Sequence, residues 1–303
     1  MRTVYLGTTE FAVTVLRRLA DSPHRPVLVV TPPDRPRGRG RRTGSPPVAD
    51  ACSELGLELL QTESINRPDA VDRVRAAAPE VGVVCAFGQL IGEPLLSELP
   101  MLNVHPSLLP RWRGAAPIER AIMTGDVGTG VTIIRVGAGY DSGPIALQER
   151  VAITPGEDYG SLATRLAELG AELIVRALDL EAAGELEPRE QDESLATYAE
   201  KIAPDERRLD PGRTATELER TVRALSPHLV AFIELDGGER LGVRAAVAER
   251  AELGAGRLVA GAGALRLGCS EDALRLELVQ PAGGRPMAAD EYLRGHPAPR
   301  LPG

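Results

Sequence analysis

The sequence has little of what a membrane-bound or secreted protein needs. No apolar run approaches the roughly 20 residues that a membrane-spanning helix requires. The first residues, MRTVYLG, do not have the pattern of a signal peptide, because they contain no apolar stretch of about 7–15 residues followed by a small-residue cleavage site. They read as a first β-strand instead. We therefore expect neither a signal peptide nor a membrane partner, and we expect a cytoplasmic location.

Cysteine and histidine are also scarce. The three cysteines, Cys52, Cys85 and Cys269, are far apart and odd in number, and the sequence contains no CxxC motif. The four histidines are scattered without the spacing of a set of metal ligands. The sequence therefore predicts neither a disulfide framework nor a bound metal ion.

Lysine is almost absent, since it occurs once, at Lys201, and every other basic residue is arginine. The net charge is −8, and a chain this acidic lacks the usual charge of a nucleic-acid-binding protein. The last hundred residues, 204–303, hold fourteen arginines against fifteen acids. A nucleic-acid-binding face in that region would therefore require the charges to be segregated in space.

One loop concentrates the arginines. The segment 34–42, DRPRGRGRR, places Arg35, Arg37, Arg39, Arg41 and Arg42 within eight residues, and the last four are the candidate phosphate contacts. Phosphate oxygens are the natural partners of such a cluster, and in an acidic protein the local field matters more than the net charge. Glycine spacing and like-charge repulsion predict a loop that is poorly ordered without RNA. The alternative interpretation is a solvated basic loop with no partner.

The first half of the chain has the pattern of an α/β domain. Its 303 residues are enough for about two domains, and 43% of them are hydrophobic, which allows folded cores. The predicted strands are 3–7, 26–31, 57–60, 81–86, 102–104 and 130–136, and the predicted helices are 11–21, 48–56, 68–78, 117–124 and 159–183. This alternation predicts a Rossmann-like domain with a mostly parallel sheet covered by helices on both faces. No G-x-G-x-x-G follows the first strand, so the dinucleotide fingerprint is missing.

The second half follows a different pattern. Charged residues around 185–206 end the alternation, and a predicted helix at 214–224 comes next. The predicted strands after it are 230–235, 240–247, 256–259, 264–267 and 274–279. Short strands at close spacing indicate a small β-barrel, here OB-like. We therefore divide the chain into an α/β domain at 1–189, a linker at 190–206 and an OB-like domain at 207–303.

Two polar side chains stand at the end of one predicted strand. Asn103 and His105 are two residues apart, so the period of a strand places both side chains on one face. Ligands of an open α/β sheet bind beyond the carboxyl ends of its strands. An amide and an imidazole at that edge can hold an oxygen that becomes negative, as transfer of a carbonyl group requires. An isolated pair of this kind can also simply cap a strand.

A turn framed by glycines supplies a carboxylate. The segment 137–143, GAGYDSG, follows the predicted strand at 130–136 and contains Asp141. A carboxylate near an imidazole orients it and favours its charged form, and it can accept the proton that an attacking amine loses. The alternative is a turn aspartate that binds its own backbone.

A long run strengthens the interpretation of these three residues. The run SLLPRWRGAAPI extends from Ser107 to Ile118, and together with Asn103, His105 and Asp141 it resembles the folate-dependent formyltransferases. Further similar segments follow the family's order: GTTEF at 7–11, TPPDRP at 31–36, GRG at 38–40, GVTI at 130–133, TYAEKI at 197–202 and QPAG at 280–283. The resemblance therefore covers nearly the whole chain.

The sequence departs from the family pattern at three places. Glu10 stands where the family usually has aspartate, and Pro106 replaces a glycine that many members have. The segment SPHL at 226–229 lacks the Trp-Pro expected after Ser-Pro. The last departure concerns the C-terminal domain alone.

The resemblance implies a catalytic trio and a co-substrate. Asn103 and His105 would stabilise a tetrahedral oxyanion, and Asp141 would orient His105 and help the amine to lose its proton. The co-substrate would be a reduced folate, 10-formyltetrahydrofolate, with no metal ion and no covalent enzyme intermediate. The residues that the resemblance assigns to folate binding are Ser107, Leu108, Leu109, Pro110, Phe87, Gly88 and Leu90.

The resemblance also implies the acceptor. The run RWRGAAPI at 111–118 is similar to family members that formylate the amine of methionine esterified to initiator tRNA. We expect the loop arginines Arg37, Arg39, Arg41 and Arg42 and the 207–303 domain to bind that tRNA. We expect the enzyme to act as a monomer. One alternative is an enzyme that formylates a small amine such as a sugar nucleotide, against which this run and the C-terminal domain argue. Another is an RNA-binding module without catalysis, against which the complete trio argues.

The peptide bond between Leu109 and Pro110 is expected to be cis. The run must turn sharply beside the strand end, and an X–Pro bond adopts the cis form at a cost of only about 0.5–1 kcal/mol. The resemblance to the family predicts the same geometry.

Overall fold

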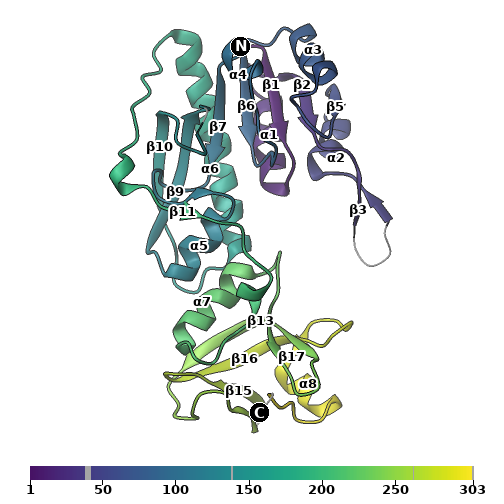
Figure 1. Cartoon of the computed structure of the whole chain (residues 1–303), viewed down its shortest axis with the longest axis vertical. Coiled ribbons are helices and arrows are strands. Elements are labelled where there is room, and N and C mark those ends of the chain that lie inside the picture. The colour runs from purple at the N-terminus through teal and green to yellow at the C-terminus, as the bar shows by residue number, and fades with distance from the viewer. Residues whose placement is uncertain (38–41, 138, 262, 302–303) are drawn as a thin grey trace. The chain divides into compact units, whose positions relative to one another are not determined.

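The computed structural model describes residues 1–37, 42–137, 139–261 and 263–301 (Figure 1). The side chains of residues 36, 37, 42 and 43 are also outside this description. The chain forms two compact units. The N-terminal unit comprises Met1–Gly114, Thr129–Val151 and Ala163–Tyr198, and the C-terminal unit comprises Ala115–Gly128, Ala152–Leu162 and Ala199–Gly303.

The N-terminal unit contains a seven-stranded sheet in the order β10-β9-β7-β6-β1-β2-β5. The strands are β1 (Thr3–Gly7), β2 (Pro26–Thr31), β5 (Leu59–Gln61), β6 (Val81–Cys85), β7 (Met101–His105), β9 (Gly128–Arg135) and β10 (Ile145–Ala152). The strands from β5 to β7 pair in parallel, whereas β9 pairs antiparallel with β7. The mostly parallel sheet predicted from the alternating pattern is therefore confirmed.

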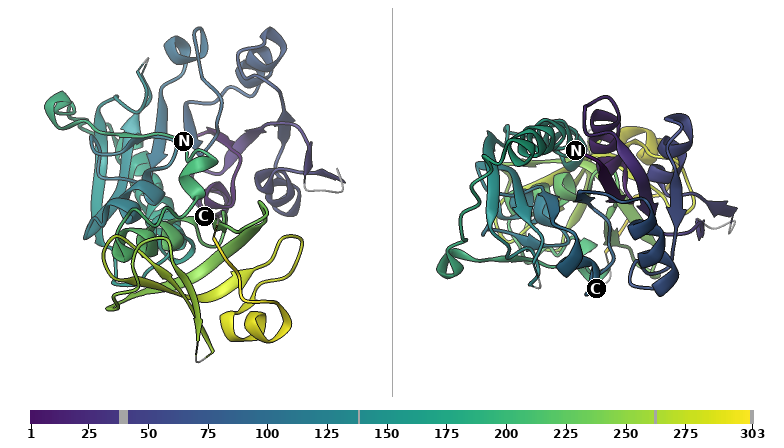
Figure 2. Two further views of the ribbon diagram at one scale, coloured as in Figure 1. Left: turned by 60° about the horizontal axis from the view of Figure 1, so that its bottom comes forward. Right: turned by 90° about the horizontal axis from the view of Figure 1, so that it is seen from above.

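Helices cover both faces of this sheet (Figures 1 and 2). They are α1 (Glu10–Ala20), α2 (Pro47–Glu54), α3 (Pro68–Ala76), α4 (Leu95–Glu98) and α6 (Tyr159–Ala183). Alternate residues of β1 face different helices. Val4 and Leu6 join the core cluster that includes residues of α3 and α4. Tyr5, between them, donates its hydroxyl to the backbone oxygen of Ala12 in α1 at 2.5 Å.

The C-terminal unit is built on an antiparallel sheet in the order β12-β13-β16-β15-β14, with β17 pairing to β16. The elements are β12 (Ala231–Glu234), β13 (Arg240–Glu249), β14 (Leu258–Gly261), β15 (Ala264–Gly268), β16 (Ala273–Gln280), β17 (Met287–Ala288) and α8 (Ala289–Gly295). Register shifts around Ala245 bend β13, as bulges do in strongly coiled sheets. This antiparallel sheet after the α/β half agrees with the predicted fold class.

Two helices pack within the C-terminal unit, α5 (Pro117–Thr124) and α7 (Ala215–Leu225). Local sequence explains their ends. Pro117 begins α5, and Gly125 ends it in the left-handed conformation at φ 78°. Thr214 and Glu217 form a capping box at the start of α7, because each side chain binds the other's backbone N–H.

Several elements were not predicted. They are β10, β17, α8, the hairpin of β3 (Arg35–Arg37) and β4 (Arg42–Gly44), α4, the pair β8 (Arg113–Gly114) and β11 (Tyr198–Ala199), and the 3-10 turns at Glu193–Leu195 and Asp205–Arg207. The strand β10 is an edge strand whose sequence, IALQERVA, mixes polar residues without regular alternation.

No helix among the described residues is long and apolar enough to cross a membrane.

Gly170 sets how closely α6 can approach β7. A Cβ atom at this position would lie 2.7 Å from Cγ1 of Val104 and 3.6 Å from Cγ1 of Val131. Val104 is 2% exposed and Val131 is fully buried, so neither side chain has room to move away. The helix therefore packs against the strand that ends at Asn103 and His105 only because residue 170 has no side chain.

We predict that Gly170→Ala destabilises the protein. Overpacking a buried contact costs about 1–3 kcal/mol, which exceeds the roughly 1 kcal/mol that alanine contributes over glycine inside a helix. Thermal melts of Gly170→Ala should therefore show a lower Tm. In a Val104→Ala background the same change should be neutral or stabilising, because Cγ1 is gone. An equal loss of Tm in both backgrounds would contradict this account of the packing.

Candidate active site

The carboxyl end of β7 presents two polar side chains. Asn103 pairs with Val84 of β6 and Ile134 of β9, and His105 pairs with Thr132 of β9. Asn103 is half-buried, whereas His105 is only 4% exposed. The strand β7 has neighbours on both sides, and it holds both side chains at its carboxyl end, where the sequence predicted a ligand.

Asp141 meets both of them. Its Oδ1 accepts a hydrogen bond from Nδ2 of Asn103 at 3.3 Å, and its Oδ2 lies 3.6 Å from Nδ1 of His105. Oδ2 also accepts the backbone N–H of Gly114 at 2.9 Å. The backbone of Asp141 is in the left-handed region, with φ 47°, and its side chain is 16% exposed. The structure thus brings together the three residues predicted as catalytic.

The orientation of His105 follows from its second nitrogen. Nε2 lies 2.8 Å from the backbone oxygen of Trp112. A carbonyl oxygen can only accept, so Nε2 carries the hydrogen of this bond. The other nitrogen, Nδ1, faces Asp141 at ion-pair distance, beyond normal hydrogen-bond length. The imidazole is therefore held from one side and directs Nδ1 toward the carboxylate.

The loop after β7 is built into the sheet. Ser107 is fully buried and donates its hydroxyl to the backbone oxygen of Arg111 at 2.6 Å. Leu109 joins a small core cluster with Ile134 and Ile145. The bond from Leu109 to Pro110 is cis, as predicted. Packing therefore explains Ser107 and Leu109 without reference to a ligand.

The loop after β6 is tied down by side chains from other loops. The backbone oxygen of Phe87 accepts the hydroxyl of Thr8 at 2.8 Å, and the oxygen of Leu90 accepts Nδ2 of Asn66 at 2.9 Å. The side chain of Phe87 belongs to the core, whereas Leu90 is 73% exposed. Gly88 has φ 74°, and a Cβ atom there would meet nothing within 4 Å. Gly88 and Leu90 thus border open space.

A buried arginine and a glutamine complete the site, and sequence reasoning found neither. Arg113 is 2% exposed, and it donates to Oε1 of Gln191 from Nε at 3.1 Å and from Nη2 at 2.8 Å. Its paired hydrogen bonds with Glu193, at 2.8 and 2.7 Å, raise the pKa of the guanidinium. Nε2 of Gln191 donates to the backbone oxygens of Asp141 and Gly143. Gln191 was missed because its segment had only the pattern of a charged linker.

The predicted arginine cluster is only partly described. Arg37 and Arg42 pair in the β3–β4 hairpin, which projects from the N-terminal unit in Figure 1. Asp34 closes the base of this hairpin by accepting hydrogen bonds from Ser45 at 3.0 Å and Gln61 at 2.8 Å. Arg39 and Arg41, and with them the predicted disorder of the loop, lie outside the described residues.

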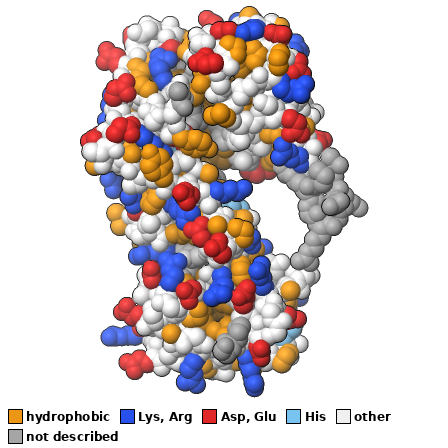
Figure 3. Space-filling model, viewed as in Figure 1, with side chains coloured by type: hydrophobic (Ala, Val, Ile, Leu, Met, Phe, Trp, Pro, Cys, Tyr) orange, Lys and Arg blue, Asp and Glu red, His pale blue; other side chains and the backbone are white. Residues whose placement is uncertain are grey.

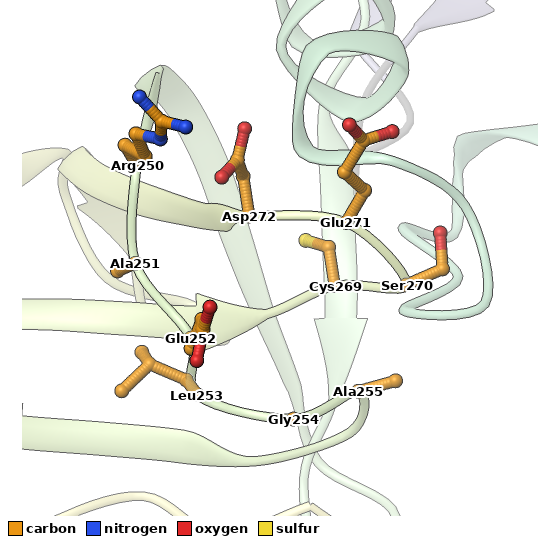
Figure 4. Close-up of a pocket in the computed structure, with 10 residues that line it drawn as sticks. All are labelled: Arg250, Ala251, Glu252, Leu253, Gly254, Ala255, Cys269, Ser270, Glu271 and Asp272. Carbon is orange, nitrogen blue, oxygen red and sulfur yellow. The ribbon is translucent and has the colours of Figure 1, made fainter.

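A cavity of about 580 Å³ lies elsewhere, within the C-terminal unit (Figure 4). Its lining includes Arg250, Glu252, Cys269 and Asp272 and none of the predicted site residues. Burial raises the pKa of the Cys269 thiol to about 11, so it is a poor nucleophile near neutral pH. Among the described residues, no group of three His, Cys, Asp or Glu side chains has the arrangement of a metal site.

Comparisons with known proteins agree with this fold. The family model described as "Formyl transferase" matches residues 1–178, and the one described as "Formyl transferase, C-terminal domain" matches residues 201–297. The sequence is 43% identical over 300 residues to a methionyl-tRNA formyltransferase from Halorhodospira halophila, covering 97% of this chain and 96% of the relative. Seven further bacterial relatives with the same name are 40–43% identical.

Two solved structures have the same fold at low sequence identity. HypX from Aquifex aeolicus, in complex with tetrahydrofolic acid, aligns with a TM-score of 0.66 at 18% identity. The alignment covers 97% of this chain and 47% of HypX, so this chain spans about half of that protein. An N-formyltransferase from Helicobacter canadensis, in complex with folinic acid and dTDP-3-aminofucose, aligns with a TM-score of 0.64 at 14% identity, covering 91% of this chain and 98% of the other.

The two matched domains, in this order, define the class of the protein as a formyl transferase. Identity above 40% along almost the whole length narrows the class further. The chain belongs to the methionyl-tRNA formyltransferase family.

One buried hydroxyl holds the loop that follows His105. Oγ1 of Thr132 donates to the backbone oxygen of Ser107 at 2.6 Å, and it accepts the backbone N–H of Leu109 at 3.2 Å and Nε2 of Gln148 at 2.9 Å. On the same strand, the hydroxyl of Thr129 is buried and has no partner among the described residues. The two threonines therefore form a natural pair for comparison.

We predict that Thr132→Val lowers the free energy of unfolding, because each buried group left unpaired costs about 1–3 kcal/mol. Thr129→Val, with the same change of shape, should be neutral or stabilising, since it removes a hydroxyl that binds nothing. Urea unfolding of both variants measures the difference. Equal losses of stability would show that the hydrogen bonds of Thr132 do not hold this loop.

Proposed function

We propose that the protein transfers the formyl group of 10-formyltetrahydrofolate to the α-amine of methionyl-initiator-tRNA. The product is N-formylmethionyl-tRNA, which is used in translation initiation. The observation on which this rests is the identity of about 43% to methionyl-tRNA formyltransferases along both domains. The meeting of Asn103, His105 and Asp141 at the sheet edge supports it from the side of the chemistry.

The reaction proceeds by direct attack of the amine on the formyl carbon. A bond forms between the amine nitrogen and that carbon, and the formyl oxygen becomes an oxyanion. In this scheme Nδ2 of Asn103 donates to the oxyanion, and so does Nδ1 of His105 when the ring is an imidazolium, because Nε2 already uses its own hydrogen to bind the Trp112 oxygen. A preorganised donor is worth most where charge develops. The intermediate collapses when the bond from carbon to N10 of the folate breaks, and N10 takes up a proton.

Asp141 positions the other two residues and assists the proton transfer. It binds Asn103 through Oδ1 and faces His105 through Oδ2, so one carboxylate positions both side chains. Its side chain is partly exposed, which lets it accept the proton of the amine directly or through one water molecule. No other carboxylate is needed in this scheme.

Two buried nucleophilic side chains described near this edge do not suit covalent catalysis. The hydroxyl of Ser107 is fully buried and already donates to a backbone oxygen. Cys85, at the end of β6, is buried, and burial raises the pKa of its thiol to about 12. A thiol with that pKa is protonated at neutral pH and is a weak nucleophile. Direct transfer therefore agrees with the groups that are present.

The folate would bind along the carboxyl edge of β6 and β7. These strands are neighbours in the sheet, so the loops that follow them start side by side. We propose that Phe87, Gly88 and Leu90 edge the pterin through their backbone, together with the loop from Ser107 through Leu108 and Leu109 to Pro110. The open space at Gly88 and the exposure of Leu90 fit such a ligand.

The tRNA would contact both domains. We propose a catalytic domain at 1–189, a linker at 190–206 and a tRNA-binding OB-like domain at 207–303. On the face drawn in Figure 3, basic and acidic side chains are interspersed. The loop arginines Arg37, Arg39, Arg41 and Arg42 would supply the main phosphate contacts.

The amine that accepts the formyl group is the point to test, because the fold alone does not decide it. The structure from H. canadensis shares the fold and was solved with a sugar nucleotide. The test supplies 10-formyltetrahydrofolate with methionyl-tRNA, with dTDP-amino sugars or with free methionine, and measures the formylated product. Formylation of the amino sugar but not of methionyl-tRNA would overturn the proposal.

We also propose that the enzyme acts in the cytoplasm, because its tRNA substrate is aminoacylated and used there. We propose further that it is a monomer and binds no membrane. Size-exclusion chromatography with light scattering tests whether it is a monomer. A dimer that persists at nanomolar concentration would contradict it.

We predict that Asn103→Ala and His105→Ala each lower the rate of formyl transfer while the fold remains intact. Loss of one oxyanion donor typically costs about 10²–10³ in rate. Single-turnover assays measure the chemical step, and thermal melts check folding. Near-normal transfer by both variants would remove these residues from the mechanism.

The arginine loop is predicted to act through phosphates. Each phosphate that a protein neutralises releases counterions and contributes about −0.7 to −0.9 to the slope of log K against log salt. Replacing Arg37, Arg39, Arg41 and Arg42 by serine should weaken methionyl-tRNA binding and flatten that slope, with folate affinity unchanged.

A matched control for this experiment removes four exposed arginines of the same unit, Arg17, Arg67, Arg73 and Arg75, which all pair with acids. It changes the net charge by the same amount but should leave the salt slope as it is. An unchanged slope in the loop variant would mean that the loop is only a solvated basic surface.

A further inference from the structure

We propose that Gln191, anchored by Arg113, is a positioning residue that keeps Asp141 in its reactive place. This inference rests on the proposed function of Asp141. Nε2 of Gln191 donates to the backbone oxygen of Asp141 at 2.9 Å and to that of Gly143 at 2.7 Å. One amide group therefore binds both ends of the three-residue turn that presents the carboxylate.

This turn needs a clamp. Asp141 has φ 47°, a left-handed conformation that costs free energy for a residue with a side chain. Gly143 packs so closely that a Cβ atom there would clash with the backbone oxygen of Arg135. A turn that combines a disfavoured conformation with such close packing persists only where its surroundings hold it. The side chain of Gln191, fifty residues further along the chain than Asp141, binds the backbone of this turn.

The orientation of the Gln191 amide is determined by Arg113. A guanidinium can only donate, so the atom that receives its Nε and Nη2 must be Oε1. The NH₂ group then points to the two carbonyl oxygens, which can only accept. Glutamine satisfies both sides at once, whereas a carboxylate at the same place would satisfy Arg113 and repel the carbonyl oxygens.

Arg113 connects this clamp to both titratable members of the trio. Its neighbour Trp112 accepts the Nε2 hydrogen of His105, and its other neighbour Gly114 donates its N–H to Asp141. Arg113 itself is nearly fully buried and is held by the bidentate pair with Glu193. Fixing one buried side chain therefore fixes the backbone groups that hold His105 and Asp141.

The test is the nearly isosteric change Gln191→Glu, which keeps the acceptor for Arg113 and removes the N–H donors. We expect kcat to fall by about tenfold to a hundredfold, since a small misplacement at a reacting centre costs up to about 10² in rate. The KM values for folate and for methionyl-tRNA should stay within about threefold, because neither ligand touches Gln191 in this proposal. A purely structural role would lower the Tm without this split between kcat and KM.

The chain offers a matched control in Gln280. Its Oε1 accepts Nε and Nη2 of Arg244 at 3.0 and 2.9 Å, and its Nε2 donates to the backbone oxygen of Gly284 at 2.9 Å. Gln280→Glu therefore makes the same chemical change in the same kind of clamp within the C-terminal unit. Its Tm measures what this change costs a clamp of the same kind. A loss of kcat in Gln191→Glu well beyond that in Gln280→Glu supports the proposal, and an equal loss of kcat in both variants would overturn it.

A second variant covers the case in which Gln191→Glu is too unstable to assay. Glu193 is 68% exposed, so Glu193→Gln weakens the anchor of Arg113 from the surface and leaves Gln191 in place. It should show a smaller loss of kcat, again with unchanged KM. Full kcat in every foldable variant would overturn the positioning role. If the unchanged enzyme forms no formylmethionyl-tRNA at all, the proposed function fails instead, so the two failures are distinguishable.

Discussion

The carboxylate of Asp141 holds together groups of one segment, 103–114, that lies well before it in the sequence. It receives the amide of Asn103 from β7 and the backbone N–H of Gly114 from the segment after it, and it faces the imidazole of His105. A carboxylate has enough lone pairs to accept several donors at once, which lets one side chain define the relative positions of the others. The geometry of the site therefore depends on where this single group is held.

That position is obtained from buried backbone contacts more than from charge. The amide of Gln191 binds the turn on both sides of Ser142, and the guanidinium of Arg113 determines how that amide points. Asp141 itself sits in a left-handed backbone conformation, which is costly for any residue other than glycine. The chain thus accepts local strain at the reactive group and compensates for it with hydrogen bonds from a distant segment.

The sheet supplies the second constraint. Parallel neighbours β6 and β7 end at one edge, and the buried hydroxyl of Thr132 on β9 ties the following loop to that edge. On the other face, Gly170 allows α6 to approach Val104 closely. Asn103 and His105 alternate with Val104 along the strand, so tight packing behind the strand keeps both polar side chains directed to the opposite face.

Much of the fold could be predicted from the sequence because it depends on periodicity. The buried strands of the first half and the long helix at 159–183 have strong patterns, and the structure has them within a few residues of the predicted bounds. The hairpin of β3 and β4 and the edge strand β10 were missed. Their short or mixed sequences pair because of neighbouring strands, and no local pattern reports such a pairing.

The same division applies to the site. Asn103, His105 and Asp141 were predicted because an amide, an imidazole and a carboxylate stand at strand ends within a long run that resembles one family. The cis bond at Pro110 was also predicted, since proline is the residue at which that geometry costs little. Gln191 was not predicted, because a glutamine in a charged segment has no signature of its own.

The sequence by itself determined the order of elements, the residue types of the reactive edge and the family to which the chain belongs. Only the tertiary structure decided which distant groups hold those residues, namely that Gln191 reaches Asp141 across fifty positions and Arg113 reaches Gln191 across seventy-eight. The reason is physical. Strand and helix patterns depend on residues that are close in the sequence, so they can be recognised there. A hydrogen bond between distant residues exists only after folding has excluded water and fixed both partners.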